Sequence, residues 1–339
     1  MKSYKRDNEI INECINVERK LSKFFFKTNF NLRKEIIDKI LKKIDNYRIY
    51  KKKINNVNFY FNLSSYIARS AILNYNTNAK YFFEPQTTKL LTLINKNLGN
   101  TLIGGAFIGD HACLLAKQNS KNTIFAFEPD KINFKFLKLN KQKNNLNNLN
   151  ISNKCLYKND TTYLKIEIPL NKDSAYINTE KKLLKKKSNT ISIDSFVKKN
   201  NIHNIRTIFI DVEGNEINIL KGAMKILTTS CENIIFEVHS QYLNFKDGLI
   251  NLDIIKLLEK LNFNLYAIRD DHDNVGKYNK IELINLRKVY YEGPPHGFNI
   301  FATKNKKILK HKDIIILNRK LSPKYLLYKK SSLFHPVGT

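Results

Sequence analysis

A glycine turn followed by an acidic residue is the part of this sequence best suited to hold a nucleoside. Residues 102–110 read Leu-Ile-Gly-Gly-Ala-Phe-Ile-Gly-Asp, and a second apolar run ends in Phe127-Glu128-Pro129. Gly105 and Gly109 would let the backbone approach a ligand closely, and the helix expected after them would offer free N–H groups. Glu128 lies about 20 residues past the turn, where a carboxylate accepts hydrogen bonds from both hydroxyls of a ribose.

The spacing of the glycines bears on which nucleoside cofactor the turn would hold. A dinucleotide site has the pattern G-x-G-x-x-G, and in an alignment that starts at Gly104 the second glycine is replaced by Ala106. A side chain there obstructs a pyrophosphate but is compatible with a ligand that has no phosphates. The turn therefore favours S-adenosylmethionine (SAM), while a dinucleotide and a structural βαβ unit without a ligand stay open on this stretch alone.

Polar groups also stand where other predicted strands end. These groups are Glu128, Asp211 and the pair Glu237 and His239. In open α/β sheets, ligands bind beyond the carboxyl ends of the strands. Because all of these residues fall at such ends, the sequence predicts one site at that edge of the sheet.

The composition indicates a globular and strongly basic protein. The chain has 339 residues, 42% of them hydrophobic, which is enough for one large domain plus an extension. Lys and Arg number 59 against 30 Asp and Glu, which gives a net charge of +29. Such a charge is typical of proteins that bind nucleic acid or an anionic surface. The lysines are scattered along a chain rich in Asn and Ile, however, and this favours a compositional bias.

Cysteine usage and hydropathy bear on the compartment. The cysteines are far apart and form no CxxC pair; they are Cys14, Cys113, Cys155 and Cys231. This argues against a disulfide or metal framework and fits a reducing compartment. No apolar run approaches the ~18 residues of a membrane span, and the first residues lead into no signal-peptide core. We therefore expect a cytoplasmic protein.

Hydrophobic periodicity predicts alternating strands and helices around these residues. The strands expected after the glycine turn are 123–127, 150–157, 163–170, 190–193, 206–212, 233–238, 263–268 and 298–302. Joined by right-handed helical crossovers, they predict an α/β fold with a doubly wound, Rossmann-like sheet. We expect a helical, basic N-terminal extension with a short strand over 1–80, a main domain over 81–304 and a basic, irregular tail over 305–339.

The main domain resembles the FkbM-type methyltransferases, a branch of the SAM-dependent, Rossmann-like class. The matching motifs are Glu84-Pro85, Gly105-Ala106 with Gly109-Asp110, Phe127-Glu128-Pro129, Ile210-Asp211-Val212-Glu213-Gly214 with Glu216, Leu220-Lys221-Gly222-Ala223 and Phe236-Glu237-Val238-His239. The resemblance implies a sheet of about seven strands with the last strand antiparallel. It also implies SAM as the cofactor and O-methylation, often of sugars or other small hydroxyl compounds.

Two positions depart from the family pattern. The strand before the glycine turn usually carries an Asp where this chain has Ile103, and Phe107 stands where the family commonly has Asn. In the family, the Asp at this position helps to hold the methionine end of SAM. In this chain, Glu84 or Asp110 would take over that role, or SAM binding would be weak.

The resemblance assigns roles residue by residue. The expected cofactor-binding residues are Glu84, Gly105, Ala106, Gly109, Asp110, Glu128 and Asp211, and the expected catalytic residues are Asp211 and His239. His239 would act as a general base on the acceptor hydroxyl. Alternatively, Asp211, Glu237 and His239 would bind a divalent metal that lowers the pKa of that hydroxyl.

Simpler readings of these acids are open as well. Glu128 would serve as a helix-capping acid beside Asp130, and Glu213 and Glu216 would cap the helix that follows them. The predicted activity is methyl transfer to a hydroxyl of a small molecule or glycan. The alternatives are a catalytically silent protein that binds nucleic acid or another polyanion, and an RNA methyltransferase.

Overall fold

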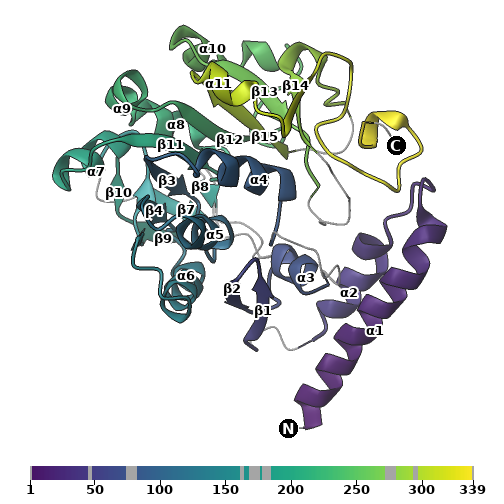
Figure 1. The fold of residues 1–339 in the computed structure, drawn as a ribbon. Coiled ribbons are helices and arrows are strands. Elements are labelled where there is room, and N and C mark those ends of the chain that lie inside the picture. Colours follow the sequence, from purple (N-terminus) through teal and green to yellow (C-terminus); the bar gives the residue numbers. More distant parts are fainter. Residues whose placement is uncertain are drawn as a thin grey trace.

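A nine-stranded sheet forms the centre of the molecule (Figure 1). The computed structural model describes residues 2–44, 48–73, 82–160, 164–167, 176–177, 185–271, 280–292 and 297–337. The strands lie in the order β16-β14-β13-β15-β12-β11-β3-β4-β5. Their bounds are β3 Asn100–Gly104, β4 Ile124–Phe127, β5 Leu149–Ser152, β11 Ile205–Ile210, β12 Asn233–His239, β13 Asn264–Ile268, β14 Ile281–Asn285, β15 Gly297–Thr303 and β16 Ile314–Leu317.

The strand directions confirm the predicted fold class. The neighbouring strands β12, β11, β3, β4 and β5 are all parallel, and β15 runs antiparallel between β12 and β13. The sheet is therefore doubly wound, with β15 inserted antiparallel between β12 and β13, and β14 and β16 run in the same direction as β15. It has nine strands instead of the expected number of about seven because β14 pairs with β13 and β16 pairs with β14.

Each face of the sheet has its own buried cluster, which explains why the central strands are apolar throughout. Ile208 and Phe209 are neighbours on β11, yet Phe209 joins the cluster that contains Leu115, and Ile208 joins the cluster that contains Leu220. Strands covered on both faces read as continuous hydrophobic runs. The helices are α4 Pro85–Ile94, α5 Asp110–Gln118, α6 Lys131–Lys143, α7 Ile193–Lys199, α8 Glu216–Lys221, α9 Met224–Thr229 and α10 Asp253–Lys260.

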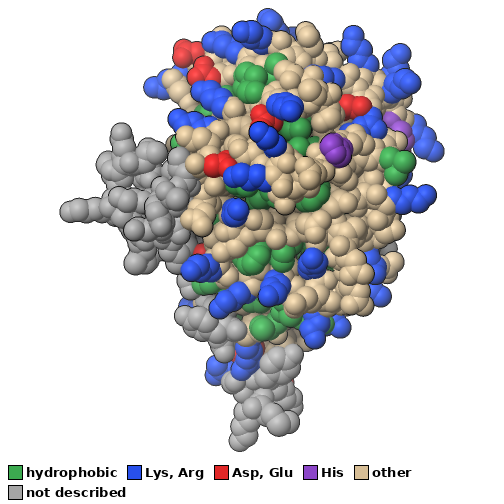
Figure 2. Space-filling view, turned by 90° about the vertical axis from the view of Figure 1, so that its left-hand side faces the viewer, with side chains coloured by type: hydrophobic (Ala, Val, Ile, Leu, Met, Phe, Trp, Pro, Cys, Tyr) green, Lys and Arg blue, Asp and Glu red, His purple; other side chains and the backbone are tan. Residues whose placement is uncertain are grey.

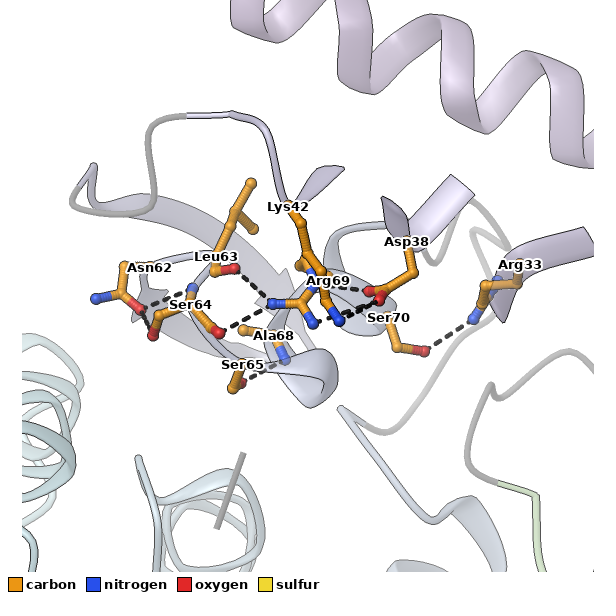
Figure 3. A network of polar contacts seen from close by, with 10 residues as sticks. All are labelled: Arg33, Asp38, Lys42, Asn62, Leu63, Ser64, Ser65, Ala68, Arg69 and Ser70. Carbon is orange, nitrogen blue, oxygen red and sulfur yellow. Dashed lines mark hydrogen bonds and ion pairs between the residues drawn. The ribbon is translucent and has the colours of Figure 1, made fainter. Parts of the chain in front are cut away.

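The N-terminal extension is held by two buried ion pairs. Its elements are α1 Lys2–Phe25, the π-helical turn η1 Arg33–Ile37, α2 Asp38–Leu41, the hairpin β1 Tyr50–Ile54 with β2 Val57–Phe61, and α3 Tyr66–Leu73. Arg33 pairs with Glu18 of α1, and Arg69 of α3 pairs with Asp38. Figure 3 shows Arg69 also donating to the carbonyls of residues 63 and 64. The sequence predicts the strand at 57–63 but not β1, whose middle is three lysines.

Asparagine side chains of α6 join the extension to the main domain. Asn140 Oδ1 accepts from the backbone N–H of Tyr60 and Nδ2 donates to its carbonyl, and Asn144 makes the same pair of bonds with Asn58. Two amide groups one helical turn apart thus satisfy the outer edge of β2, much as a neighbouring strand would.

The C-terminal segment is part of the fold and does not form the irregular tail that the sequence predicts. It contains α11 Lys306–Leu309, β16 and the short turn η4 Ser332–Phe334. Ser322 and Lys324 are buried. The backbone of Lys324 forms an isolated parallel β-bridge with that of Asp270, after β13. A single four-residue strand and an extended segment give little periodic signal, so the pattern alone does not reveal them. The boundary at 305 stays a prediction, and residue 81 lies outside the described residues.

Several short elements complete the fold. They are the pair β6 Cys155–Leu156 with β10 Thr190–Ile191, the three-stranded sheet of β7 Leu164–Glu167, β8 Tyr176–Ile177 and β9 Lys185–Ser188, and the turns η2 Leu249–Asn251 and η3 Leu286–Lys288. β7 coincides with part of the strand predicted at 163–170; the remainder of that prediction lies outside the described residues. None of the helices in the described part of the chain has the length and apolar character needed to cross a membrane.

Candidate active site

The glycine turn after β3 lies directly against the end of β11. Gly105 has φ +78°, and a Cβ at this position would overlap the backbone carbonyl of Asp211. The N–H groups of Gly105 and Ala106 both donate to the carbonyl of Phe127, at distances of 3.0 and 2.9 Å. The turn is therefore fixed between the carboxyl ends of β11 and β4, and only glycine fits at its first position.

Gly109 forms the N-terminus of α5 at the other end of the turn. Its φ is +90°, and a Cβ there would come within 2.7 Å of Leu137 Cδ1 and 2.8 Å of Cys113 Sγ. The close approach of α6 to this helix start thus accounts for the second glycine without reference to a ligand. The first turn of α5 begins at the carboxyl edge of the sheet, where the carboxylate of Asp110 accepts from the N–H groups of Asp110 and His111.

Glu128 lies at the tip of β4, and its carboxylate faces the glycine turn. Its Oε2 accepts from the N–H of Phe107 and its Oε1 accepts from the N–H of Asp130, each at 2.8 Å. Burial raises the pKa of Glu128 to about 8, and the nearby Asp130 adds to the rise. Each oxygen has a second lone pair, so the ribose-binding role stays a prediction that this geometry permits. The predicted capping role belongs to Asp130, whose side chain accepts from the first N–H groups of α6.

Backbone strain is concentrated at this edge of the sheet. Apart from asparagines, the described non-glycine residues with positive φ are Lys27, Glu84, Phe107 and Glu213. Glu84 precedes α4, Phe107 is in the glycine turn and Glu213 follows β11. Left-handed conformations cost side-chain-bearing residues of order 1–3 kcal/mol and cluster at functional sites. At Phe107, the conformation explains why asparagine, which tolerates it, is common in the resembling family.

Three carboxylates converge beyond β11 and β12. Among the described residues, Asp211, Glu213 and Glu237 form the one group of acids, histidines or cysteines whose ligand atoms all lie within 4.8 Å of one another. All three side chains are partly exposed. Burial and the charge of Glu237 raise the pKa of Asp211, and burial and the charge of Glu213 raise that of Glu237.

His239 lies next to this group without joining it. Its Nδ1 accepts from the N–H of Gln241 at 3.0 Å, and its ring lies 5.3 Å from that of Tyr242. An Nδ1 that accepts a hydrogen bond places the ring proton on Nε2 in the neutral form. The structure thus brings together two of the three predicted metal ligands, Asp211 and Glu237, and adds Glu213 in place of His239.

Glu84 occupies a buried junction at the same edge. Its Oε2 accepts from Asn299 Nδ2 at 2.6 Å, and its Oε1 lies 3.4 Å from Lys324 Nζ. Asp270, also buried, accepts from the N–H groups of Gln86 and Thr87 at the start of α4. Burial and the charge of Glu84 raise the pKa of Asp270 to about 7.

The acids expected to replace the missing aspartate are close to each other. Ile103 is buried in the hydrophobic core. Asp110 begins α5, is buried, and lies 3.6 Å from His111 Nε2. Burial raises the pKa of Asp110, and the charge of Glu84 contributes to the rise. Both candidates therefore carry carboxyl groups near the turn, and their roles towards SAM stay predictions.

Glu216 binds the loop that precedes α8, and its predicted capping role stays a prediction. Its Oε1 accepts from the N–H of Val212 and Gly214, at 3.3 and 3.1 Å, where α8 begins. Burial raises the pKa of Glu216 to about 7. Glu216 therefore shapes the loop that presents Asp211 and Glu213.

Sequence reasoning missed three residues at this edge: Asn299, Asp270 and Lys324. An acid at the end of an apolar strand is the signal that identifies Glu128 and Asp211, and the same signal would have identified Asp270, two residues past the end of β13. Lys324 has no local signal, because it arrives from a segment 240 residues away from Glu84.

Comparison with known proteins gives a match that covers the turn and the acids after β4, β11 and β12. Residues 104–265 match the methyltransferase FkbM domain. No match was found among curated proteins. Because that domain covers the motifs at Gly105, Glu128, Asp211 and Glu237, the match and the geometry concern the same site.

Solved structures with a similar fold include methyltransferases of several kinds. The precorrin-6y C5,15-methyltransferase of Geobacter metallireducens is 12% identical, with a TM-score of 0.37 over 65% of this chain and 86% of that chain. An O-methyltransferase of Bacillus cereus in complex with SAH is 15% identical, with a TM-score of 0.36 over 65% and 80%. An rRNA methylase of Streptococcus thermophilus is 10% identical, with a TM-score of 0.34 over 64% and 93%. At these scores the domain match alone carries the assignment: the chain contains a methyltransferase FkbM domain over residues 104–265 and is a SAM-dependent methyltransferase.

Proposed function

We propose that the enzyme methylates a hydroxyl oxygen of a small molecule or glycan. The observation that carries this proposal is the group of carboxylates at Asp211, Glu213 and Glu237, adjacent to the turn at Gly105. Methylation of a hydroxyl requires a group that takes its proton, and carboxylates with raised pKa values are suited to that role near neutral pH.

SAM supplies a methyl group on a sulfonium that is already a good leaving group. The chain has to bind the cofactor, align the acceptor oxygen with the methyl and remove the hydroxyl proton. We assign the turn from Gly105 to Gly109 and Glu128 to cofactor binding. Asp211 is the proposed proton acceptor, because it lies both against the turn and within the carboxylate group. His239, with its ring proton on Nε2, would donate a hydrogen bond to the acceptor.

A divalent cation is compatible with the same carboxylates. Mg²⁺ and Mn²⁺ prefer oxygen ligands, and the ligand atoms of Asp211, Glu213 and Glu237 converge from two adjacent strand ends. A cation there would offset the mutual repulsion of the acids and stabilise the alkoxide form of an acceptor. In this variant of the proposal, the carboxylates orient the acceptor and do not take its proton directly.

Calorimetry with S-adenosylhomocysteine and MnCl₂ tests cofactor binding at the glycine turn and cation binding at the carboxylates. We expect S-adenosylhomocysteine to bind, and Asp211→Asn to weaken binding of Mn²⁺ while Glu259→Gln, a change on the exposed face of α10, leaves it unaltered. Absence of heat with S-adenosylhomocysteine at millimolar concentration would contradict the assignment of the turn. Binding of the cofactor without binding of Mn²⁺ would leave Asp211 as the proton acceptor.

On one face of the molecule, the distribution of charge supports a small acceptor over nucleic acid. On the face shown in Figure 2, Lys and Arg side chains are spread over the whole surface with neutral areas between them. A nucleic-acid site gathers such residues along one face or groove. Titration with an RNA oligonucleotide at several salt concentrations tests the alternative, since binding through phosphates weakens steeply with salt.

A further inference from the structure

Exposed apolar side chains are concentrated in the N-terminal extension. Val17, Leu21 and Phe24 lie along one stripe of α1, because they are spaced four and three residues apart. Their exposed fractions are 38, 39 and 75%, and Phe26, directly after the helix, is 46% exposed. We call these four residues the α1 apolar stripe.

The same part of α1 is basic. Arg19, Lys20, Lys23 and Lys27 are all exposed. The one acid between residues 14 and 34 is Glu18, which is buried and paired with Arg33. The surface around the stripe therefore carries positive charge that no neighbouring acid of this segment offsets.

The exposed rings are held in place by a fixed turn. The N–H of Lys27 donates to the carbonyl of Leu327 at 3.0 Å, and the N–H of Asn29 donates to that of Tyr328 at 2.6 Å. Lys27 and Asn29 both have positive φ, and Thr28 Oγ1 bonds back to the carbonyl of Phe25. Phe25 turns inward against Phe30, with ring centroids 4.7 Å apart, while the side chain of Phe24 is exposed and the ring of Phe26 lies 5.8 Å from that of His335.

A cavity of about 370 Å³ opens beside the end of the stripe. The cavity lies between α1 and the C-terminal segment. Its lining includes Phe26 of the stripe and Lys23, one of the basic residues beside the stripe. The apolar part of the lining includes Phe25, Phe26, Phe30, Leu326, Leu327 and Tyr328. The rest of the lining is polar and includes Glu18, Arg33 and Asp271. An apolar stripe and a partly apolar cavity thus adjoin the same basic surface.

We propose that the α1 apolar stripe docks on a membrane surface that contains anionic lipid. A helix with apolar residues on one side and lysines beside them lies in the plane of the interface, with its rings in the acyl boundary and its cations at the headgroups. Juxtaposed lysines attract anionic headgroups. The cavity next to Phe26 would receive the end of an acyl chain. This proposal is independent of which acceptor the enzyme methylates.

The absence of tryptophan from the sequence gives a direct test. Phe24→Trp places a single fluorophore in the stripe, and Leu98→Trp places one at a site that is 62% exposed in another part of the surface. With vesicles of phosphatidylcholine and phosphatidylserine in equal parts, we expect a blue shift of emission for Phe24→Trp and none for Leu98→Trp. Vesicles of phosphatidylcholine alone should give a much smaller shift, and salt should reduce it.

Sedimentation with the same vesicles measures the contribution of the stripe. We expect Leu21→Ser/Phe24→Ser to lose at least about tenfold in bound fraction per lipid, while the matched pair Leu98→Ser/Ile132→Ser binds as the wild type does. Unchanged circular dichroism and S-adenosylhomocysteine binding will show that the variants are folded. The proposal fails if the wild type does not sediment with anionic vesicles or if both pairs lose binding equally. It also fails if light scattering shows a dimer that Leu21→Ser/Phe24→Ser dissociates, because a second copy then covers the stripe.

Discussion

Lys324 and Glu84 form a buried ion pair at the carboxyl edge of the sheet, with Nζ 3.4 Å from Oε1. Lys324 comes from the C-terminal segment, and Glu84 precedes α4. The charge of Lys324 also lowers the pKa values of Glu237 and Asp270, which burial raises. One lysine from outside the matched domain therefore offsets part of the negative charge that the proposed active site accumulates.

Replacing Lys324 should destabilise the protein strongly. Lys324→Met leaves Glu84 and Asp270 buried without their cation, and removal of one partner of a buried pair costs about 3–5 kcal/mol. Urea unfolding at pH 7.5 measures the change. Lys330→Met, on the exposed surface of the same segment, should alter the free energy of unfolding by less than about 0.5 kcal/mol. Equal stability of the two variants would show that the pair contributes nothing.

Gly105→Ala should cost more than an alanine at another glycine with positive φ. Gly105 and Gly248 have φ of +78° and +86°, but a Cβ at Gly248 has no neighbour nearer than 4.0 Å. We expect on the order of 1–3 kcal/mol of destabilisation from strain at Gly248, whose ψ of 151° places it in a region nearly restricted to glycine, and a larger loss at Gly105, where the Cβ also overlaps the carbonyl of Asp211. Urea unfolding compares the two; similar losses would mean that the turn can move away from β11.

Glu128→Gln should weaken cofactor binding and remove part of its pH dependence. Because the pKa of Glu128 is raised to about 8, the carboxylate that we propose accepts the ribose hydroxyls becomes populated only as the pH rises towards 8. We expect the affinity for S-adenosylhomocysteine to increase between pH 6 and 9 in the wild type. In Glu128→Gln it should be about tenfold or more lower at pH 9 and nearly independent of pH. Calorimetry at three pH values checks this, with Glu259→Gln as the control, and a parallel pH profile in the two proteins would refute the ribose role.

Asp211→Asn should stabilise the protein without ligand at high pH. The folded state raises the pKa of Asp211, so between the unfolded and folded pKa values the native state binds more protons and the stability of the wild type falls as the pH rises. The variant lacks this loss and should be more stable by on the order of 1 kcal/mol at pH 8, with little difference near pH 4. Thermal unfolding at both values measures it. A variant that is less stable at pH 8 would show that the carboxylate is needed structurally.

Much of the main domain could be predicted from local pattern. The glycines at 105 and 109 and the apolar runs of β3, β4, β11 and β12 are consecutive in the chain, and strands covered on both faces leave a strong signal. The same runs placed Glu128, Asp211 and Glu237 at one edge, and the structure confirms that Glu128 and Asp211 directly follow β4 and β11 and that Glu237 lies near the end of β12. Their proposed roles are still predictions.

The remaining features of the sheet and of the site depend on contacts between segments that are distant in the sequence. Whether His239 or Glu213 completes the carboxylate group depends on the path of the loop after β11, where Glu213 has φ +57°. β16 and Lys324 join the sheet and the site through pairing partners that sequence periodicity does not identify. The local pattern of the C-terminal segment is therefore consistent with a tail, although several of its side chains, including those of Ser322, Lys324 and Tyr325, are buried.

The amide pairs between α6 and β2 affect more than the attachment of the extension. With the backbone groups of Asn58 and Tyr60 bonded to Asn144 and Asn140, the exposed side of a two-stranded ribbon is closed by side chains from a helix. An open ribbon edge is a template on which further chains assemble. Asparagines at these two positions therefore protect a lysine-rich, two-stranded hairpin against edge-to-edge polymerisation.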